Sequence, residues 1–172
     1  MHLSMKKWIV CLLAAVLGLG SCNILRETPH EREARMQREA QMVLENIQAG
    51  EFTIDITRMY PLRGTARSVT GQSVTVKDGV LHSGLPFFGQ AWRVPYGGGH
   101  ALNFQAPIRS YSVAAHPKGG YVVNLYVKTD EDEHVYQFRI FENGGTSLDV
   151  QSGNRDRISF SGEMLFEPDA AR

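Results

Sequence analysis

The side chains of this 172-residue chain that could act as nucleophiles or metal ligands do not form the common catalytic patterns. Beyond residue 21 there is no G-x-S-x-G turn and no S-x-x-K pair, the arrangements that activate a serine in many hydrolases. The five histidines of that region lie far apart and include no H-E-x-x-H motif that would place two imidazoles on zinc: His30, His82, His100, His116 and His134. We therefore predict no enzymatic activity, no metal and no other cofactor.

Two other segments contain residue types that bind ions. The acidic run 130–133 offers carboxylate oxygens, but it lacks the spaced ligands, central glycine and distal glutamate of an EF-hand calcium loop. We expect a solvated turn there, with His134 in an exposed charge pair beside Asp132 and Glu133. The glycines at 97–99 lack the lysine and the helix of a phosphate-binding loop, so we expect a flexible connection. A pair of glycosidase carboxylates stays open, since such a pair needs proximity only in space.

The segment Leu85–Tyr96, LPFFGQAWRVPY, is the most distinctive candidate for binding. Its prolines restrict strand pairing, Gly89 permits an unusual backbone angle, and its aromatic side chains supply large apolar area. One interpretation is that these aromatics close one end of a β core. The other is that they form a rim around a pocket for a small apolar ligand or for an envelope protein. The contact residues would then be Phe87, Phe88, Trp92, Tyr96 and, as the polar contact, Arg93.

Cys22 is the residue with the clearest predicted chemistry. Lys6 and Lys7 precede an apolar run, 8–19, which is too short to cross a bilayer and is typical of a secretion signal. The run ends in Leu-Gly-Ser-Cys, which looks like a bacterial lipobox: small residues let a peptidase grip the backbone, and the thiolate accepts a diacylglyceryl group. We predict cleavage before Cys22 and its lipidation. The alternative is an ordinary secretion signal with a chance cysteine.

Lipidation of Cys22 would also predict where the protein resides, with the membrane as its partner. Two or three acyl chains anchor a protein stably, whereas a single chain holds it only marginally. Asn23 is not the aspartate that retains many such proteins at the inner membrane, which favours the outer membrane. No dense acidic run follows, which favours the periplasmic face of that membrane over the cell surface. The other cysteine, Cys11, lies inside the signal, so no disulfide is expected.

The composition excludes several classes of protein and indicates a single domain. With 18 basic and 18 acidic residues there is no electrostatic footprint for nucleic acid, and 42% hydrophobic residues are too many for a disordered chain. Removing residues 1–21 leaves 151 residues with a net charge of minus 2, enough chain for one core. We expect a signal peptide at 1–21, a tether at 22–28, a helix at 29–50, a β domain at 51–167 and a tail at 168–172.

The expected helix has both a start signal and one apolar face. Thr28 suits the N-cap, Pro29 suits the first helical position, and Glu31 would complete a capping box. Apolar residues then recur on one face, at Met36, Ala40, Val43, Leu44 and Ile47. The opposite face is charged and is expected to be solvated. Binding of phospholipid headgroups is the alternative, although interleaved acidic residues weaken it.

From Glu51 onward the hydrophobic period changes from helical spacing to two, as in half-buried strands. Examples are the stretches 52–57, 73–77 and 136–140, and turn signals such as Asp78–Gly79 separate them. We count roughly nine strands without a helical crossover. The fold class is therefore mainly β, a single antiparallel β-barrel or β-sandwich with one N-terminal amphipathic helix.

One predicted strand differs from the others because it is apolar at nearly every position. In Tyr121–Val127 only Asn124 is polar, which is typical of a strand covered on both faces. We expect this strand to be central in the sheet, with the N-terminal helix covering part of the sheet. Its neighbour should be the strand 134–142, joined to it by the acidic turn.

Several segments together resemble a family of uncharacterised Bacteroidetes lipoproteins, domain of unknown function 4251. The similarity rests on LPFFGQAW at Leu85–Trp92, the glycine-rich stretch leading to Asn103 and Phe104, Tyr111, and N-R-x-x-I-S-F-S-G at Asn154–Gly162. It spans nearly the whole chain beyond the signal. Phe87 departs from the tyrosine expected there, which removes a hydroxyl group. The resemblance implies a membrane-anchored β domain in a bacterial envelope, but no known activity and no catalytic residues.

Three of the shared positions are expected to be fold devices. In the turn before the last strand, Asn154 can adopt a left-handed backbone and Arg155 can bridge carbonyls or a carboxylate. Gly162 interrupts the last strand, as at a bulge or a barrel corner.

The sequence thus favours a lipid-anchored envelope protein that is a non-catalytic binding or accessory domain. Its partner would be a small apolar ligand or an envelope protein. The first alternative is a structural envelope lipoprotein without a pocket, in which the aromatics belong to the core. The second is an enzyme that acts on envelope glycan or lipid.

Overall fold

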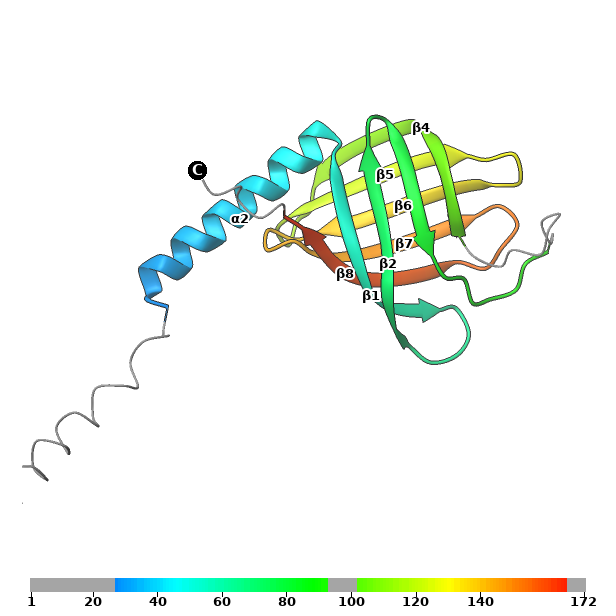
Figure 1. The fold of residues 1–172 in the computed structure, drawn as a ribbon, viewed down its shortest axis with the longest axis horizontal. Coiled ribbons are helices and arrows are strands. Elements are labelled where there is room, and N and C mark those ends of the chain that lie inside the picture. Colours follow the sequence, from blue (N-terminus) through cyan, green and yellow to red (C-terminus); the bar gives the residue numbers. More distant parts are fainter. Residues whose placement is uncertain (1–26, 93–101, 167–172) are drawn as a thin grey trace, which may run out of the picture. The chain divides into compact units, whose positions relative to one another are not determined.

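The computed structural model describes residues 27–92 and 102–166, and Figure 1 shows their fold. The strands pair in chain order, and β1 also pairs with β8, so the antiparallel sheet closes into a barrel. The mainly β fold with one N-terminal helix is confirmed, and of the two architectures left open the chain adopts the barrel. The elements are α2 (Pro29–Ala49), β1 (Phe52–Pro61), β2 (Arg67–Lys77), β3 (Val80–Leu85), β4 (Leu102–Ala115), β5 (Tyr121–Lys128), β6 (Glu133–Ile140), β7 (Gly145–Ser152) and β8 (Ile158–Leu165).

The described residues form eight strands instead of the nine or so expected from the sequence. Strands in globular proteins usually have about five or six residues. Here β2 has 11 residues and β4 has 14. These long strands explain why fewer strands fill the same length of chain.

Inward-facing side chains fill the barrel. Tyr136, Phe138 and Phe160 are each less than 2% exposed. The ring of Phe52 meets that of Phe138 edge to face, with the centroids 5.5 Å apart. An eight-stranded barrel encloses a space that side chains can just fill. The barrel interior is therefore a packed hydrophobic core.

The apolar strand β5 is covered on one face only, which corrects the expectation that both faces are buried. Its residues Val123, Leu125 and Val127 are buried inside the barrel, whereas Val122 and Tyr126 are only partly buried. In a closed barrel every strand has two neighbours, so an apolar run no longer marks a central position. The predicted pairing of β5 with the following strand is confirmed, from Tyr121 opposite Ile140 to Lys128 opposite Glu133.

The predicted hairpin turn is confirmed, whereas Gly162, expected to interrupt the last strand, lies within a continuous β8 opposite a bulge in β1. Asp78 and Gly79 have φ angles of 52° and 72°, as a two-residue hairpin turn between β2 and β3 requires. Gly162 lies opposite Ile56, where the register of β1 shifts between Ile56 and Arg58. A Cβ atom on residue 162 would lie only 1.9 Å from the carbonyl oxygen of Asp55. Glycine is therefore required because the β1 backbone approaches β8 too closely for any side chain.

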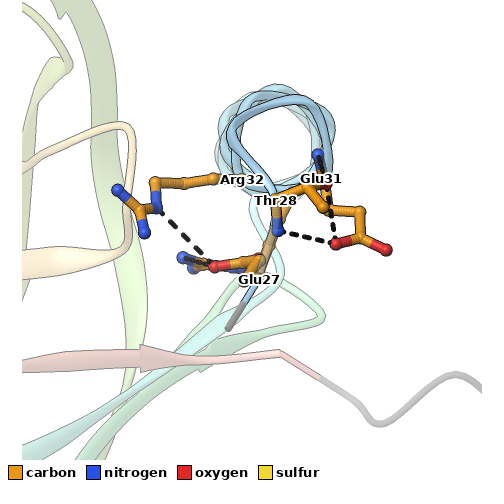
Figure 2. Close-up of polar contacts among 5 residues, drawn as sticks. Glu27, Thr28, Glu31 and Arg32 are labelled. Carbon is orange, nitrogen blue, oxygen red and sulfur yellow. Dashed lines mark hydrogen bonds and ion pairs between the residues drawn. The ribbon is translucent and has the colours of Figure 1, made fainter. Parts of the chain in front are cut away.

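The chain divides into two compact parts, residues 1–35 and 36–172, and α2 begins in the first. The predicted capping box is present, as Figure 2 shows: the Thr28 backbone amide and hydroxyl each donate to Oε2 of Glu31 at 2.8 Å. The Glu31 amide donates back to the Thr28 hydroxyl at 3.3 Å. These hydrogen bonds lower the pKa of the Glu31 carboxyl. Glu27 forms ion pairs with Arg32 and Arg35.

In the second part, the rest of α2 contributes to the barrel core. Val43 and Ile47 of the predicted apolar face are fully buried, whereas Met36 at its start is 48% exposed. The Tyr111 hydroxyl on β4 donates to the carbonyl oxygen of Ile47, and burial raises the pKa of Tyr111 to about 12. This part of the helix thus packs at the barrel end where β1 begins. Among the described helices, none has the length and hydropathy to cross a membrane.

Candidate functional site

The two ends of the barrel differ in their connections. The loops 62–66, 129–132 and 153–157 and the described part of the β3–β4 connection, residues 86–92, lie at one end, drawn on the right in Figure 1, which we call the loop end. The opposite end has short turns and the C-terminal half of α2. Binding residues are often carried on loops that a rigid scaffold positions. Binding residues are therefore expected at the loop end.

The aromatic segment is attached to the loop before β8 by backbone hydrogen bonds. The Trp92 amide donates to the Asn154 carbonyl at 2.9 Å, and the Asp156 amide donates to the Gln90 carbonyl at 2.9 Å. The Gln90 amide also donates to the Asp156 carboxylate at 3.0 Å. Ala91 forms an isolated antiparallel bridge with Arg155. Residues 90–92 are thus held in place although they belong to a long connection.

The described aromatic side chains of this segment have different environments. Phe87 is 7% exposed and belongs to the core, with the Arg155 guanidinium 5.5 Å from its ring centroid. Phe88 is 48% exposed and Trp92 is 68% exposed. The guanidinium of Arg67 lies 4.6 Å from the Phe88 ring centroid. The segment therefore fits both interpretations in part: one ring closes the core, and two rings face solvent.

Three other predictions concern this segment. Arg93 and Tyr96 lie outside the described residues, so their predicted contacts stay predictions. Cys22, in the N-terminal region, also lies outside the described residues, so its lipidation stays a prediction. Gly89 does not have the positive φ that would require glycine. Instead, a Cβ there would lie 2.9 Å from the Phe87 ring and 3.1 Å from Cβ of Asp156. Close packing explains this glycine.

The acidic turn is solvated at Asp130, Glu131 and Glu133, as expected, but Asp132 is folded against the neighbouring loop. Asp132 is only 8% exposed. Its carboxylate accepts hydrogen bonds from the Glu133 amide at 2.8 Å and from the backbone and side-chain nitrogens of Asn154 at 3.2 Å each. Asn154 does not have the left-handed backbone we expected. It helps to satisfy the buried charge of Asp132.

His134 is buried at 2% exposure, so the expected exposed charge pair is wrong. Its Nδ1 lies 2.8 Å from the Ser152 hydroxyl, and its ring stacks on Phe104 with centroids 4.8 Å apart. Burial lowers the pKa of His134 to about 4, with a further decrease from Arg155 and an opposing effect of Asp132. The imidazole is therefore neutral at physiological pH.

A second polar contact lies deeper in the barrel. The Ser83 hydroxyl donates to the Leu102 carbonyl oxygen at 2.7 Å and lies 2.8 Å from the Tyr136 hydroxyl. Burial raises the pKa of the Tyr136 phenol, so it stays protonated. Most buried polar side chains of the described residues thus lie at or toward the loop end: Ser83, Asp132, His134, Ser152, Arg155 and Asp156.

A cleft of about 470 Å³ opens beside this cluster. Its walls are β4 residues 102–107, residues 128–132, His134 and Arg155. Phe88 and Trp92 are not among its lining residues. A cleft of about 600 Å³ lies at the opposite end, but none of the ionisable residues lining it, Glu39, Lys118 and Glu142, is buried.

The comparisons with known proteins agree with this fold. A family model described as a domain of unknown function, DUF4251, matches residues 34–164. The chain belongs to the DUF4251 family. The resemblance predicted from the motifs is thus confirmed. Among curated proteins, none matches the chain.

A solved DUF4251 structure supports the barrel architecture. The chain is similar to a DUF4251 family protein from Bacteroides eggerthii DSM 20697, with a TM-score of 0.60 and 13% sequence identity. The alignment covers 74% of this chain and 87% of that chain. At this identity the likeness concerns the fold alone.

In this DUF4251 barrel the buried cluster supports hydrogen bonding better than acyl transfer. The Ser152 hydroxyl lies within hydrogen-bonding distance of the His134 imidazole, which is the first requirement of a nucleophilic serine. The carboxylate of Asp132, however, accepts its hydrogen bonds from backbone and asparagine donors. Among the described residues, none of the hydrogen bonds joins a carboxylate to the His134 ring. Nor do the described residues bring together three potential metal ligands.

The buried cluster was missed from the sequence although a signal for part of it was present. His134 stands two residues before Tyr136, so the period of two places it on the same inward face as Tyr136, Phe138 and Ile140. The adjacent acidic residues predicted an exposed position for His134 instead. Ser152 carries the same signal, since it stands two residues after Val150 on the inward face of β7. Arg155 lacks such a signal, because it lies in a loop outside the strands.

Proposed function

We propose that this DUF4251 protein is a lipid-anchored envelope protein whose loop end binds an envelope protein without catalysis. The observation that carries the proposal is the pair Phe88 and Trp92, exposed by 48% and 68% on a segment fixed by hydrogen bonds to the loop before β8. Tryptophan residues are enriched among those that dominate binding energy. A side chain on an already ordered backbone costs less conformational entropy on binding.

The filled barrel favours a protein partner over a small apolar ligand. Large side chains such as Tyr136, Phe138 and Phe160 occupy the interior. The exposed aromatic residues lie outside it and are not among the residues lining the cleft at the loop end. Exposed aromatic side chains outside this cleft suit a protein partner better than a ligand that must be enclosed. A purely structural envelope role is the alternative, and it would leave the exposed Trp92 without a partner.

Replacing Trp92 with alanine should weaken partner binding without unfolding the barrel. Because the side chain is 68% exposed, its removal should change the melting temperature by no more than about 2 °C. Truncating a tryptophan at the centre of an interface costs about 2 kcal/mol or more, roughly thirtyfold in affinity. Photo-crosslinking in intact cells from a benzoylphenylalanine at residue 92, which keeps a large aromatic side chain there, identifies the partner. The affinity of that partner is then measured for the wild-type protein and for Trp92→Ala.

The matched control is the same probe at Val113, which is 41% exposed near the C-terminal end of β4, away from the loop end. We expect one discrete adduct from residue 92 and none from residue 113. Equal adducts from both positions would contradict the proposal. A melting temperature lowered by many degrees in Trp92→Ala would assign the side chain to the fold instead.

Replacing Cys22 with alanine should release the protein from the membrane or leave its signal uncleaved. The proposed anchor is a diacylglyceryl thioether with an added amide-linked chain at this cysteine, and each buried methylene contributes about 0.8 kcal/mol. Intact mass spectrometry of the wild-type protein from membranes should show the lipid mass and loss of residues 1–21. Cys11→Ala is the control and should retain the anchor. An unmodified wild-type mass would exclude lipidation.

A further inference from the structure

Strand β4 pairs with different neighbours along its two halves. Residues Leu102–Pro107 pair with β3, from Leu85 to Val80. The pairing with β5 begins only at Ile108, opposite Val127, and continues to Ala115. In the part of the chain that the structure describes, residues 102–107 thus have no strand on the side away from β3.

The direction of the backbone groups on this free side follows from one hydrogen bond. The Ile108 amide donates to the Gly79 carbonyl at 2.8 Å, on the side of β3. Because amide and carbonyl groups alternate between the two edges of a strand, those of Asn103 and Gln105 are directed to the opposite edge. Both residues are exposed. Pro107, which has no amide hydrogen, also suits an edge position.

The cleft of about 470 Å³ lies beside this edge, since residues 102–107 form one of its walls. Residues 128–132 form another wall, together with His134 and Arg155. Pockets that hold ligands usually have about 300 to 1,000 Å³. The cleft therefore has room for a short segment of extended chain next to the amide and carbonyl groups of Asn103 and Gln105 that face away from β3, where none of the described strands pairs with them.

The charges around the cleft favour a basic occupant. The Lys128 ammonium is paired with the Glu133 carboxylate at 2.8 Å, so its charge is compensated. Asp130 and Glu131 are exposed at the tip of the opposite wall. A positively charged side chain on the occupant would be attracted to these two carboxylates.

We infer that the β4 edge at Asn103–Gln105 binds an extended peptide that carries a lysine or arginine and pairs with it as an added strand. In this mode main-chain hydrogen bonds supply affinity and alternate side chains supply specificity. The inference rests on the proposed function in one respect, that a protein partner approaches the loop end. It names the form of the segment which that partner would insert.

The test is selection of a library of synthetic seven-residue peptides on the full chain in detergent, with counter-selection on Gln105→Pro. Proline removes the amide hydrogen that points into the cleft and leaves the β3 pairing, which does not use this amide. We expect enriched peptides to contain lysine or arginine. Fluorescence anisotropy should show at least about tenfold weaker binding to Gln105→Pro. Gln105→Ala, which keeps the amide, is the matched control and should bind within about twofold of wild type.

A second measurement leaves the protein unchanged, in case Gln105→Pro lowers its stability. Methylating alternate backbone nitrogens of an enriched peptide should abolish binding in one phase of the alternation and not in the other. The double variant Asp130→Asn, Glu131→Gln should weaken basic peptides by about fivefold at low salt. Lack of enrichment, equal binding to Gln105→Pro, or indifference to methylation in both phases would overturn the inference.

These outcomes are separate from those of the proposed function. If the probe at residue 92 forms no adduct while peptide binding is as expected, the aromatic interface is rejected and the added strand is kept. If the probe at residue 92 still forms its adduct in Gln105→Pro, and peptides bind wild type and Gln105→Pro equally, the added strand is rejected and the aromatic interface is kept.

Discussion

Replacing Gly162 with alanine should destabilise the barrel by about 3 kcal/mol or more. The new Cβ would lie 1.9 Å from the Asp55 carbonyl oxygen and 3.0 Å from Cα of Ile56. Both atoms belong to the backbone, so rotation of a side chain cannot relieve the clash. To accept the methyl group, β1 and β8 must separate at the pair that closes the barrel.

Urea denaturation and thermal melting measure this effect. For a domain of this size, 3 kcal/mol corresponds to a fall of roughly 10 °C in melting temperature. Gly145→Ala is the matched control, because its Cβ would meet only the flexible end of the Asn143 side chain, at 3.1 Å. We expect the control to cost less than about 1 kcal/mol. Equal stability of the two variants would show that β1 can shift without cost.

The second large effect is a loss of stability in mild acid that depends on His134. Burial lowers the pKa of His134 to about 4 in the folded protein, against about 6.5 in an unfolded chain. Between these two values the unfolded chain binds a proton that the folded protein excludes. Stability therefore rises with pH across this window, is complete above pH 6.5 and is lost as the pH falls toward 4.

The size of the effect follows from the difference in pKa. One pKa unit corresponds to about 1.4 kcal/mol, so His134 should account for about 2.5 kcal/mol of lost stability at pH 4.5 relative to pH 7. The arrangement around the ring supports this direction, since Ser152 and Phe104 are neutral neighbours and Arg155 opposes a second positive charge. Only Asp132 favours the protonated form.

His134→Gln isolates this contribution, because glutamine keeps a polar group near Ser152 but does not titrate. Urea denaturation at pH 7 and pH 4.5 should show the wild type losing about 2.5 kcal/mol more than the variant. Asp149, whose carboxylate pairs with Arg139 and Arg157, has a pKa lowered from its usual value, so it stays ionised at pH 4.5 in both proteins and cancels in the comparison. Parallel losses in the two proteins would show that the His134 ring accepts a proton while folded.

The sequence predicted most of the fold because the relevant signals are local. The Thr28–Glu31 cap is formed by residues three positions apart. The turn at Asp78 and Gly79 depends on two adjacent backbone conformations. Alternation within each strand reports which side chains face the core. These features identified the helix and the strands, but they could not decide between a barrel and a sandwich, since closure needs β1 to pair with β8 across the whole domain.

The candidate site was predicted only in part, for the same reason. Phe88 and Trp92 were recognised from their type within an unusual segment, and their exposure fits the binding interpretation. Phe87, the neighbour of Phe88, lies in the core. The burial of Asp132 and His134 was missed, because the residues that cover and satisfy them, Asn154 and Ser152, follow about 20 positions later in the chain.

By itself, the sequence determined the class of fold, the start of the helix, the hairpin turn and the family. Each of these depends on neighbouring residues or on a motif that can be read along the chain. Only the tertiary structure decided that the sheet closes, that His134 is neutral and buried, and that residues 102–107 of β4 pair with β3 alone among the described strands. Those properties depend on register and packing between strands distant in the chain, which local patterns do not encode.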